Sequence, residues 1–217
     1  MFDAAAARRM MVDGQVRTAD VTDWALLDAM AALPRERFLP PPLVELAYLD
    51  GDIPLGKGRA LLKPMVLAKL IQAAQIGPGD RVLDIGCGTG YSSAVLARLA
   101  GAVVALEEDA ELARQAREAL AAIGAQKAEV VVGPLTGGWP AAAPYDVIFL
   151  NGAAEVVPDA LGRQLKPGGR IVGIGGNFPA TKATIYYPIE GQLVGRPIFD
   201  ASARVLPGFV RPPAFVF

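Results

Sequence analysis

The sequence predicts a doubly wound α/β fold with a mostly parallel sheet, and two observations carry this prediction. Short apolar runs alternate with helical patterns after about residue 64, as is typical of a parallel sheet covered on both faces. One of these runs leads directly into glycines at 86, 88 and 90, where the backbone can turn sharply and approach a ligand. The predicted strands are 81–85, 102–106, 129–132, 145–150 and 170–174.

Helices are expected before and between these strands. Pro64 favours the first turn of a helix over 65–76, and a second helix fits 91–100. The helix between the second and third strands is expected to end at Gly124, because glycine is a common helix terminator. Its apolar residues recur at helical spacing, at Leu112, Ala116, Ala119, Leu120 and Ile123.

An N-terminal helical extension and an antiparallel C-terminal edge complete the expected fold. Helices are expected over 4–15 and 22–32, whereas the prolines of 34–40 predict a firm loop without regular structure. One or two antiparallel edge strands are expected beyond residue 175, beginning around 183–187.

All 217 residues are expected to form one domain, because no long polar linker or repeat divides them. Within it, 1–63 would form the helical, substrate-side segment and 64–175 the cofactor-binding core. Residues 176–217 would supply the edge strands and a tail whose apolar last residues pack on the domain.

Composition narrows the function classes. The net charge is −1, from 21 basic and 22 acidic residues, and the basic residues form no stripe, which argues against a nucleic-acid partner. Hydrophobic residues make up 53% of the chain, but Pro, Gly or charge interrupts every apolar run before it reaches membrane-spanning length. No secretory leader is recognisable, so the cytoplasm is the expected location.

Histidine is absent and Cys87 is the single cysteine. An intrachain disulfide is therefore excluded, and the usual zinc ligands and the Ser-His and Cys-His catalytic pairs are missing. No metal site is expected. Cys87 lies in the glycine loop, where a small apolar filler is its simplest interpretation.

The stretch Arg81-Val-Leu-Asp-Ile-Gly-Cys-Gly-Thr-Gly90 is the most informative motif. A dinucleotide fingerprint would place its third glycine one position later, and Asp84 precedes the first glycine here. Taken alone, one or two of these glycines need only form a tight turn from strand to helix. The whole pattern, with Asp84, Gly86, Gly88 and Gly90, resembles motif I of the S-adenosyl-L-methionine-dependent methyltransferases, and implies their Rossmann-like fold and their cofactor.

An acid at the end of the next strand strengthens this interpretation. Glu107 lies 17 residues beyond Gly90, close to the spacing of one helix and one strand, and Glu108 follows it. Such an acid can accept hydrogen bonds from the 2′- and 3′-hydroxyls of a ribose. A solvated acid at a strand end is the alternative.

A narrower resemblance covers nearly the whole chain to about residue 175. Its pieces look like those of the protein-L-isoaspartate O-methyltransferases, and their order and spacing make the match specific. They are Met11-Val-x-x-Gln15-Val-Arg17, Leu33-Pro-Arg-Glu-Arg-Phe-Leu-Pro40, Ala47-Tyr-Leu-Asp50, Ile53-Pro-Leu-Gly56, Gly138-Trp139, Ala143-Pro-Tyr-Asp-Val-Ile148, Ala153-Ala154 and Pro158-x-x-Leu161-x-x-Gln164-Leu-x-x-Gly168-Gly169.

The resemblance implies protein repair, in which S-adenosylmethionine methylates the α-carboxylate of an isoaspartyl residue so that a succinimide can re-form. The implied partner is therefore a protein or peptide carboxylate. This chemistry suits a chain without histidine, because a carboxylate is already ionised at pH 7 and needs no general base. Positioning the acceptor oxygen against the methyl group is the main task.

Two departures from the family affect the implied site. Leu62 stands where the family has the serine assigned to the active site, and Ala60 stands where it has a threonine. Losing one hydrogen bond to a charged carboxylate costs on the order of 1.5–3 kcal/mol. In place of the family's Gly-Asp-Gly near adenine, this chain has Gly133-Pro-Leu135, so adenine would be held by apolar contacts, Leu135 among them.

Nearby polar residues offer replacements for the missing hydroxyl. Arg59 and Lys63, with Lys57 on the same segment, are candidates to pair with an anionic acceptor, and a solvated basic loop is the alternative. Asn151 lies at the end of the fourth strand, from which methyltransferases often reach the reacting methyl; a strand-end turn residue is its alternative role.

Three functions remain open from the sequence. The first is isoaspartate methyl transfer. The second is methyl transfer to a different acceptor, which the apolar Leu62 favours. The third is a non-catalytic protein that binds S-adenosylmethionine or has lost it, although the intact acid and glycine positions argue against complete loss of the cofactor. The fold alone does not decide among them.

Overall fold

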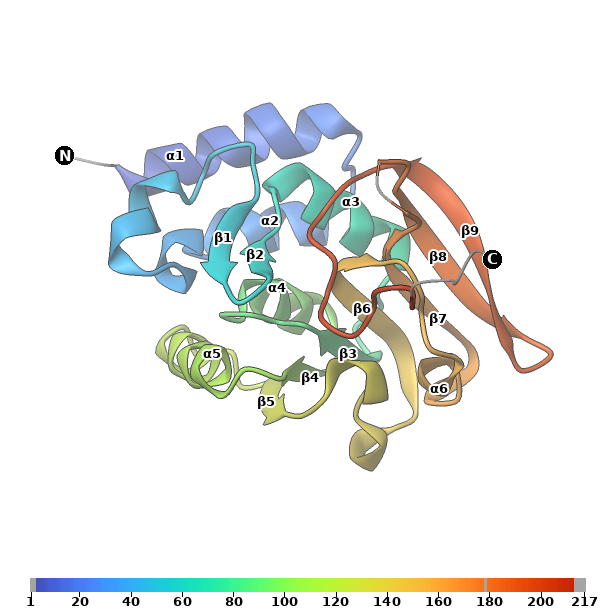
Figure 1. Cartoon of the computed structure of the whole chain (residues 1–217). Coiled ribbons are helices and arrows are strands. Elements are labelled where there is room, and N and C mark those ends of the chain that lie inside the picture. Colours follow the sequence, from blue (N-terminus) through green and yellow to red (C-terminus); the bar gives the residue numbers. More distant parts are fainter. Residues whose placement is uncertain (1–2, 178, 213–217) are drawn as a thin grey trace.

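A seven-stranded sheet forms the centre of the computed structural model, which describes residues 3–177 and 179–212 (Figure 1). The strand order is β5-β4-β3-β6-β7-β8-β9, with the first five strands parallel and the last two antiparallel. The strands are β3 (Arg81–Ile85), β4 (Ala102–Glu107), β5 (Ala128–Val132), β6 (Tyr145–Ala154), β7 (Leu165–Gly175), β8 (Lys182–Ile189) and β9 (Gln192–Asp200). The doubly wound prediction and its antiparallel C-terminal edge are confirmed.

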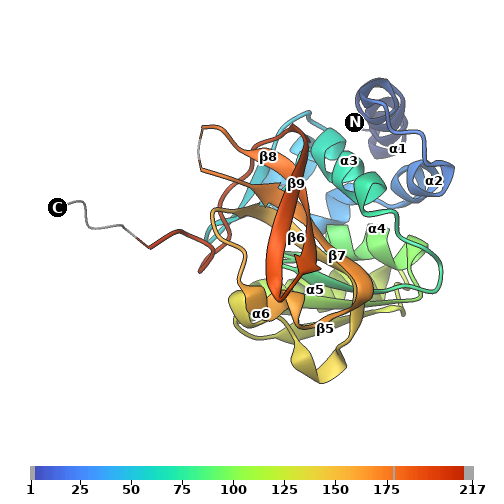
Figure 2. The same cartoon turned by 90° about the vertical axis from the view of Figure 1, so that its right-hand side faces the viewer.

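Helices cover the two faces of the sheet unequally (Figure 2). Val82, Val103 and Val147 lie on one face and share a hydrophobic cluster with the N-terminal helices. Leu83 and Ile148 lie on the other face, which is covered by short segments and α6. The helices are α1 (Ala4–Met11), α2 (Trp24–Ala32), α3 (Pro64–Ala74), α4 (Tyr91–Leu99), α5 (Ala110–Ala122) and α6 (Asp159–Gly162).

The winding of the sheet reverses between β3 and β6. The chain runs outward from β3 through β4 to β5, then returns to the other side of β3 for β6 and continues to β7. Ligands of open α/β sheets bind where such a reversal separates the carboxyl ends of two neighbouring strands. The glycine loop follows β3 directly and therefore lies at this reversal.

The N-terminal region differs in part from expectation. The first helix ends as an α-helix at Met11 and continues as a π-helix over Val12–Val16. The loop predicted for 34–40 was wrong, because Arg35–Phe38 form a 3-10 helix. Its i to i+3 bonds, such as Arg37 N to the Pro34 carbonyl at 3.0 Å, need only one turn. The flanking prolines limit the helix to that turn without preventing it.

A small hairpin lies apart from the central sheet and was not expected. β1 (Ile53–Gly56) and β2 (Arg59–Leu61) pair antiparallel as a separate two-stranded sheet. The turn between them places Lys57 and Gly58 at φ values of 49° and 75°. Strands of four and three residues show too little alternation to be recognised from sequence.

A C-terminal segment, residues 204–209, returns from the edge of the sheet to its centre (Figure 1). The Ala153 N–H donates to the Arg204 carbonyl at 2.9 Å, and the Leu206 N–H donates to the Ala153 carbonyl at 2.8 Å. Leu206 and Phe209 are buried. The sequence placed the packed apolar residues at the chain end, but 213–217 lie outside the described residues.

No helix among the described residues is long and apolar enough to cross a membrane. Within the same residues, no group of three or more acidic or cysteine side chains could hold a metal ion.

Candidate active site

The glycine loop connects β3 to α4 with three left-handed residues. Gly86, Gly88 and Gly90 have φ values of 78°, 57° and 95°, which only glycine adopts at little cost. A Cβ on Gly90 would also lie 3.2 Å from the Cβ of Ala116 on α5. The N–H groups of Gly86 and Cys87 both donate to the Leu106 carbonyl of β4, so the loop is tied to the neighbouring strand.

Asp84, at the end of β3, is completely buried beneath this loop. One carboxylate oxygen accepts hydrogen bonds from Ser92 and Ser93 Oγ, each at 2.6 Å. The other oxygen has no hydrogen-bond partner among the described residues. Burial raises the pKa of Asp84 to about 6, although the two serine hydroxyls act in the opposite direction. The carboxylate therefore keeps one buried acceptor oxygen without a donor among the described residues.

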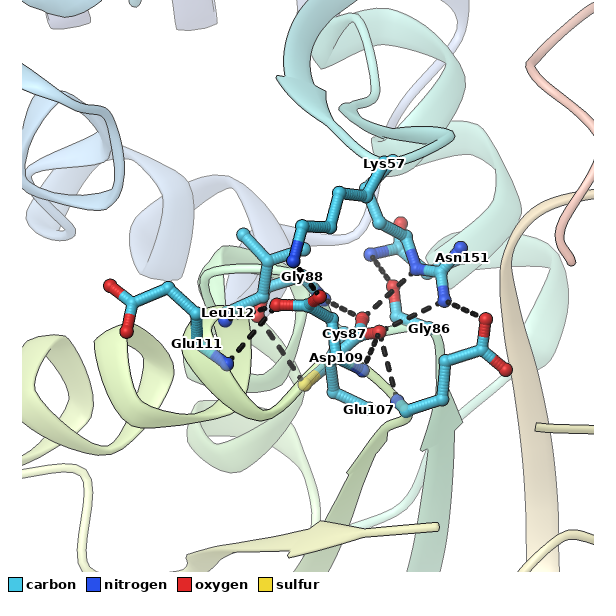
Figure 3. Close-up of polar contacts among 11 residues, drawn as sticks. Lys57, Gly86, Cys87, Gly88, Glu107, Asp109, Glu111, Leu112 and Asn151 are labelled. Atoms are coloured by element: carbon cyan, nitrogen blue, oxygen red, sulfur yellow. Dashed lines mark hydrogen bonds and ion pairs between the residues drawn. The ribbon is translucent and has the colours of Figure 1, made fainter. Parts of the chain in front are cut away.

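Asn151 and Cys87 brace the loop. The Asn151 amide donates to the Gly86 carbonyl at 3.2 Å (Figure 3) and to Ser92 Oγ at 3.0 Å, which joins β6 to the loop and to α4. Asn151 lies within β6, which continues to Ala154, so the alternative of a turn residue at the strand end was wrong. Cys87 is buried against Ala105 and Ala116, the surroundings of a small apolar filler. Burial raises the pKa of its thiol.

Glu107 lies at the end of β4 beside the glycine loop (Figure 3). Its carboxylate is fully buried and accepts five hydrogen bonds. Three come from the backbone N–H groups of Gly88, Glu108 and Asp109, at 2.9, 2.9 and 3.2 Å. The strand-end acid is therefore part of the loop's own hydrogen-bond network and is not a solvated side chain.

The other two hydrogen bonds come from Arg59. Its Nε and Nη2 donate to the two oxygens of Glu107 at 3.0 and 2.9 Å, and its side chain is 2% exposed. Glu108, which is more exposed, lies 3.4 Å from the same guanidinium. The sequence placed Arg59 either against an anionic acceptor or in a solvated loop. The structure does neither, because β2 directs Arg59 to Glu107.

The other two cations of this segment are placed differently. Lys57, exposed at the hairpin turn, forms an ion pair with Asp109 at 2.6 Å (Figure 3). This contact raises the pKa of Lys57 and lowers that of Asp109. Lys63 is half-buried at the start of α3, where its backbone N–H donates to Asp52 at 2.7 Å.

Leu62 faces no polar partner in the described structure. Its side chain is buried in the larger hydrophobic cluster, and its carbonyl accepts a 2.6 Å hydrogen bond from Arg35 Nη2. Arg35 is itself fully buried, donates to the Ala47 carbonyl at 2.7 Å, and lies over the Tyr91 ring. Burial lowers the pKa of Arg35. Sequence reasoning missed this residue, because Arg35, Glu36 and Arg37 form a charged run, which usually indicates a solvated segment.

Three leucines surround the loop from outside the β3–α4–β4 unit. Leu135, in the 3-10 helix Leu135–Gly137 after β5, is 1% exposed and would lie 3.7 Å from a Cβ on Gly86. Leu206 would lie 2.8 Å from the same Cβ, and Leu55 would lie 3.0 Å from a Cβ on Gly88. Side chains of the chain itself therefore lie directly above the glycines.

Comparison with known proteins identifies what this chain resembles. Residues 7–179 match the family model described as "Protein-L-isoaspartate(D-aspartate) O-methyltransferase (PCMT)". A protein-L-isoaspartate O-methyltransferase of Methylorubrum extorquens is 45% identical over 170 residues, which cover 78% of this chain and 74% of that relative. A relative of the same name from Gloeobacter violaceus is 39% identical over 190 residues, covering 87% and 93%.

Solved structures agree. A protein-L-isoaspartate O-methyltransferase matches with a TM-score of 0.80 and 27% identity, covering 93% of this chain, which spans 66% of that chain's length. A Plasmodium falciparum protein described as a putative protein-L-isoaspartate O-methyltransferase, in complex with S-adenosyl-L-homocysteine, matches with a TM-score of 0.78. At 16% identity, over 92% of this chain and 97% of the other, this second likeness shows the shared fold alone.

The residues of the site fit the cofactor expected from the sequence. Asp84 has an unpartnered buried acceptor oxygen, Glu107 lies at the neighbouring strand end, and Leu135 supplies an apolar wall next to Gly86. The contacts above the loop are made by the hairpin and by the C-terminal segment 204–209. Both are separate in sequence from these three residues.

Proposed function

Because the chain belongs to the protein-L-isoaspartate O-methyltransferase family, we propose that it transfers a methyl group from S-adenosylmethionine to a carboxylate. The proposed acceptor is the α-carboxylate of an L-isoaspartyl residue in a damaged protein. The observation that carries the proposal is the match to the family over residues 7–179, which includes the Asp84 loop and Glu107 at adjacent strand ends. S-adenosylmethionine supplies an activated methyl group on a sulfonium when it is bound.

The residues proposed to hold the cofactor are those at the carboxyl ends of β3 and β4. Glu107 would take the ribose hydroxyls, and Asp84 would accept a donor from the methionine part through its unpartnered oxygen. Leu135 would pack against adenine, since Pro134 offers neither a carboxylate nor an N–H. Asn151 would hold the loop in shape through Gly86.

A carboxylate acceptor agrees with the side chains available. The chain contains no histidine, and an ionised carboxylate oxygen needs no base to become nucleophilic. What the protein must supply is orientation and exclusion of water, which can account for a large part of a rate enhancement. An amine, phenol or carbon acid would require a proton acceptor in addition.

We also propose a cytoplasmic location and a protein or peptide partner, not a nucleic acid. The support for excluding nucleic acid is the balanced charge of 21 basic and 22 acidic residues without a basic stripe.

The test is methyl transfer from radiolabelled S-adenosylmethionine to an isoaspartyl peptide. The aspartyl peptide of the same sequence serves as the matched control, and a cell extract serves as a source of other acceptors. Label in the isoaspartyl peptide alone would support the proposal. Label only in the extract would point to a different acceptor, and no label in any sample would contradict methyl transfer by this chain.

A second candidate function is methyl transfer to a less polar acceptor, and the observation that favours it is Leu62. The residue that replaces the family's serine is 2% exposed and packs in the hydrophobic core, and Ala60 nearby is 9% exposed. If this loss limits the isoaspartyl reaction, Leu62→Ser with Ala60→Thr should raise its rate by roughly tenfold, or about 1.4 kcal/mol. A double variant no faster than wild type would show that the hydroxyl is not limiting.

A further inference from the structure

Side chains of the chain itself fill its proposed cofactor cleft. Gly86, Gly88 and Glu107 are all buried in a structure that contains only the chain itself. The buried state is produced by Leu55 and Arg59 of the β1–β2 hairpin and by Leu206 of the C-terminal segment. A cofactor that used the glycine loop and Glu107 would meet all three of these side chains.

Arg59 takes up the hydrogen-bonding capacity of Glu107. An ionised carboxylate has about four lone-pair directions, and this one already accepts five hydrogen bonds. Two of these are the parallel bonds of the Arg59 fork, which is a strong and geometrically specific arrangement. A ribose with two adjacent hydroxyls needs the same two oxygens. Arg59 and a ribose therefore compete for Glu107.

Leu206 covers the loop on the other side. A Cβ on Gly86 or on Gly152 would lie 2.8 Å from the Leu206 side chain, so the segment passes directly over both β3 and β6 at the sheet reversal. Backbone hydrogen bonds with Ala153 hold the segment there, and Phe209 is fully buried at its end. An apolar side chain thus lies against the backbone that a cofactor would approach.

Both covering elements lie outside the ladders of the central sheet. The hairpin is a separate two-stranded sheet whose Ile53 and Leu61 pack in the larger hydrophobic cluster. Its Arg59 is held by Glu107, whereas the exposed Lys57–Asp109 pair at the turn adds little.

Segment 204–209 is joined to β6 by the isolated bridge between Ala153 and Val205. Just after β6, the backbone N–H groups of Glu155 and Val156 donate to the Phe209 carbonyl at 2.9 and 3.1 Å. Segments held by short, local backbone contacts outside a ladder open at lower free energy than core strands do.

We propose that this chain closes its own cofactor cleft, with Arg59 competing with the ribose for Glu107 and Leu206 covering the glycine loop. The proposal rests on the proposed function. Cofactor affinity is then set by the fraction of molecules in which the hairpin and segment 204–209 have withdrawn, because only these molecules can bind. Arg59 acts here as a residue that determines affinity, not as one that contacts the methyl acceptor.

The experiment is calorimetric titration of S-adenosylhomocysteine into wild type, Arg59→Gln and Leu206→Ala. Each substitution should tighten binding by roughly tenfold, because it removes one competitor of the ligand. Lys57→Gln is the matched control, since it removes a cation from the same hairpin without touching Glu107. Affinities of Arg59→Gln and Leu206→Ala no tighter than that of Lys57→Gln would overturn the proposal.

Hydrogen exchange of the wild-type chain gives a second readout. With millimolar S-adenosylhomocysteine, amides of 53–61 and 204–209 should exchange faster, while those of β3 and β4 should exchange more slowly. Uniformly slower exchange, or no change, would contradict the closure. This measurement decides the proposal even if Arg59→Gln fails to fold, because it uses the wild-type chain.

The methylation assay separates this proposal from the function on which it rests. If the wild type binds tightly and methylates, and the variants change neither result, the proposed function is supported and the proposed closure is contradicted. If the variants bind more tightly but no acceptor is methylated, the proposed closure is supported and the proposed methyl transfer is contradicted. No binding by any of the four proteins would overturn both.

Discussion

The floor of the cleft and its cover are held by different kinds of contact. The floor, from Asp84 through the glycine loop to Glu107, is built from neighbouring parallel strands and from side-chain bonds to backbone N–H groups. The cover, made of the β1–β2 hairpin and segment 204–209, is held by buried apolar side chains, by the Arg59–Glu107 pair and by a few backbone hydrogen bonds at and just after the end of β6. The floor therefore has a fixed geometry, whereas the cover depends on a few side chains that substitution can remove one at a time.

The largest loss of folding stability is expected at the Arg59–Glu107 pair, where the floor and the cover meet. Glu107→Gln would leave a buried guanidinium without its main partner, which typically costs about 3–5 kcal/mol. Urea unfolding would measure the loss. Glu108→Gln is the control, because that carboxylate lies 3.4 Å from the same arginine but is 37% exposed, so that its loss should cost less than about 1 kcal/mol. Equal losses in the two variants would contradict a special role for the buried pair.

The next effect concerns the apolar half of the cover. Leu206→Ala should lower the free energy of unfolding by about 2–3 kcal/mol, since it leaves a cavity around a side chain that is 1% exposed. Val210→Ala, four residues along the chain and 57% exposed, should change little. Thermal and urea unfolding of the two variants provide the comparison. A neutral Leu206→Ala would mean that segment 204–209 contributes nothing to the stability of the fold.

Folding stability is expected to depend on pH through Asp84, which lies in the floor. Because its folded pKa of about 6 lies above the ordinary value of about 3.9, the folded state holds its proton more tightly. The resulting stabilisation is fully present below about pH 4 and is lost as the pH rises to about 6, by roughly 2–3 kcal/mol. Asp84→Asn cannot titrate. The stability difference between wild type and this variant should therefore change across pH 4–6.5, and a constant difference would refute the assignment.

The smallest effect is expected at the exposed end of the hairpin. Lys57→Ala removes an ion pair in which the lysine side chain is 68% exposed, so the unfolding temperature should be unchanged within error. Any difference seen at low ionic strength should disappear in 1 M salt, where charges are screened over about 3 Å. A large, salt-independent loss would show that the hairpin turn stabilises the cover more than its exposure suggests.

The same contrast explains what could be predicted from the sequence. β3, β4 and the glycine loop were predictable because strand periodicity, left-handed glycines and the spacing to Glu107 are local signals. The destination of Arg59 was not, because 48 residues separate it from Glu107 and no local pattern joins them. Leu206 likewise reaches Gly86 from beyond residues 7–179, which the family model matches. Which side chains fill a predicted cleft is a property of the tertiary structure.

The free edge of β9 bears on how copies of this chain meet in concentrated solution. An edge strand offers unpaired backbone groups to any passing strand, and Val194 and Ile198 on β9 are 49% and 37% exposed. Pro197 lacks an N–H, and the β8–β9 register shifts beside it, between Ala183 and Thr184. Together these interrupt the regular row of groups that intermolecular sheet growth requires. The strand at this edge of the sheet therefore carries two features that disfavour edge-to-edge pairing between copies of the chain.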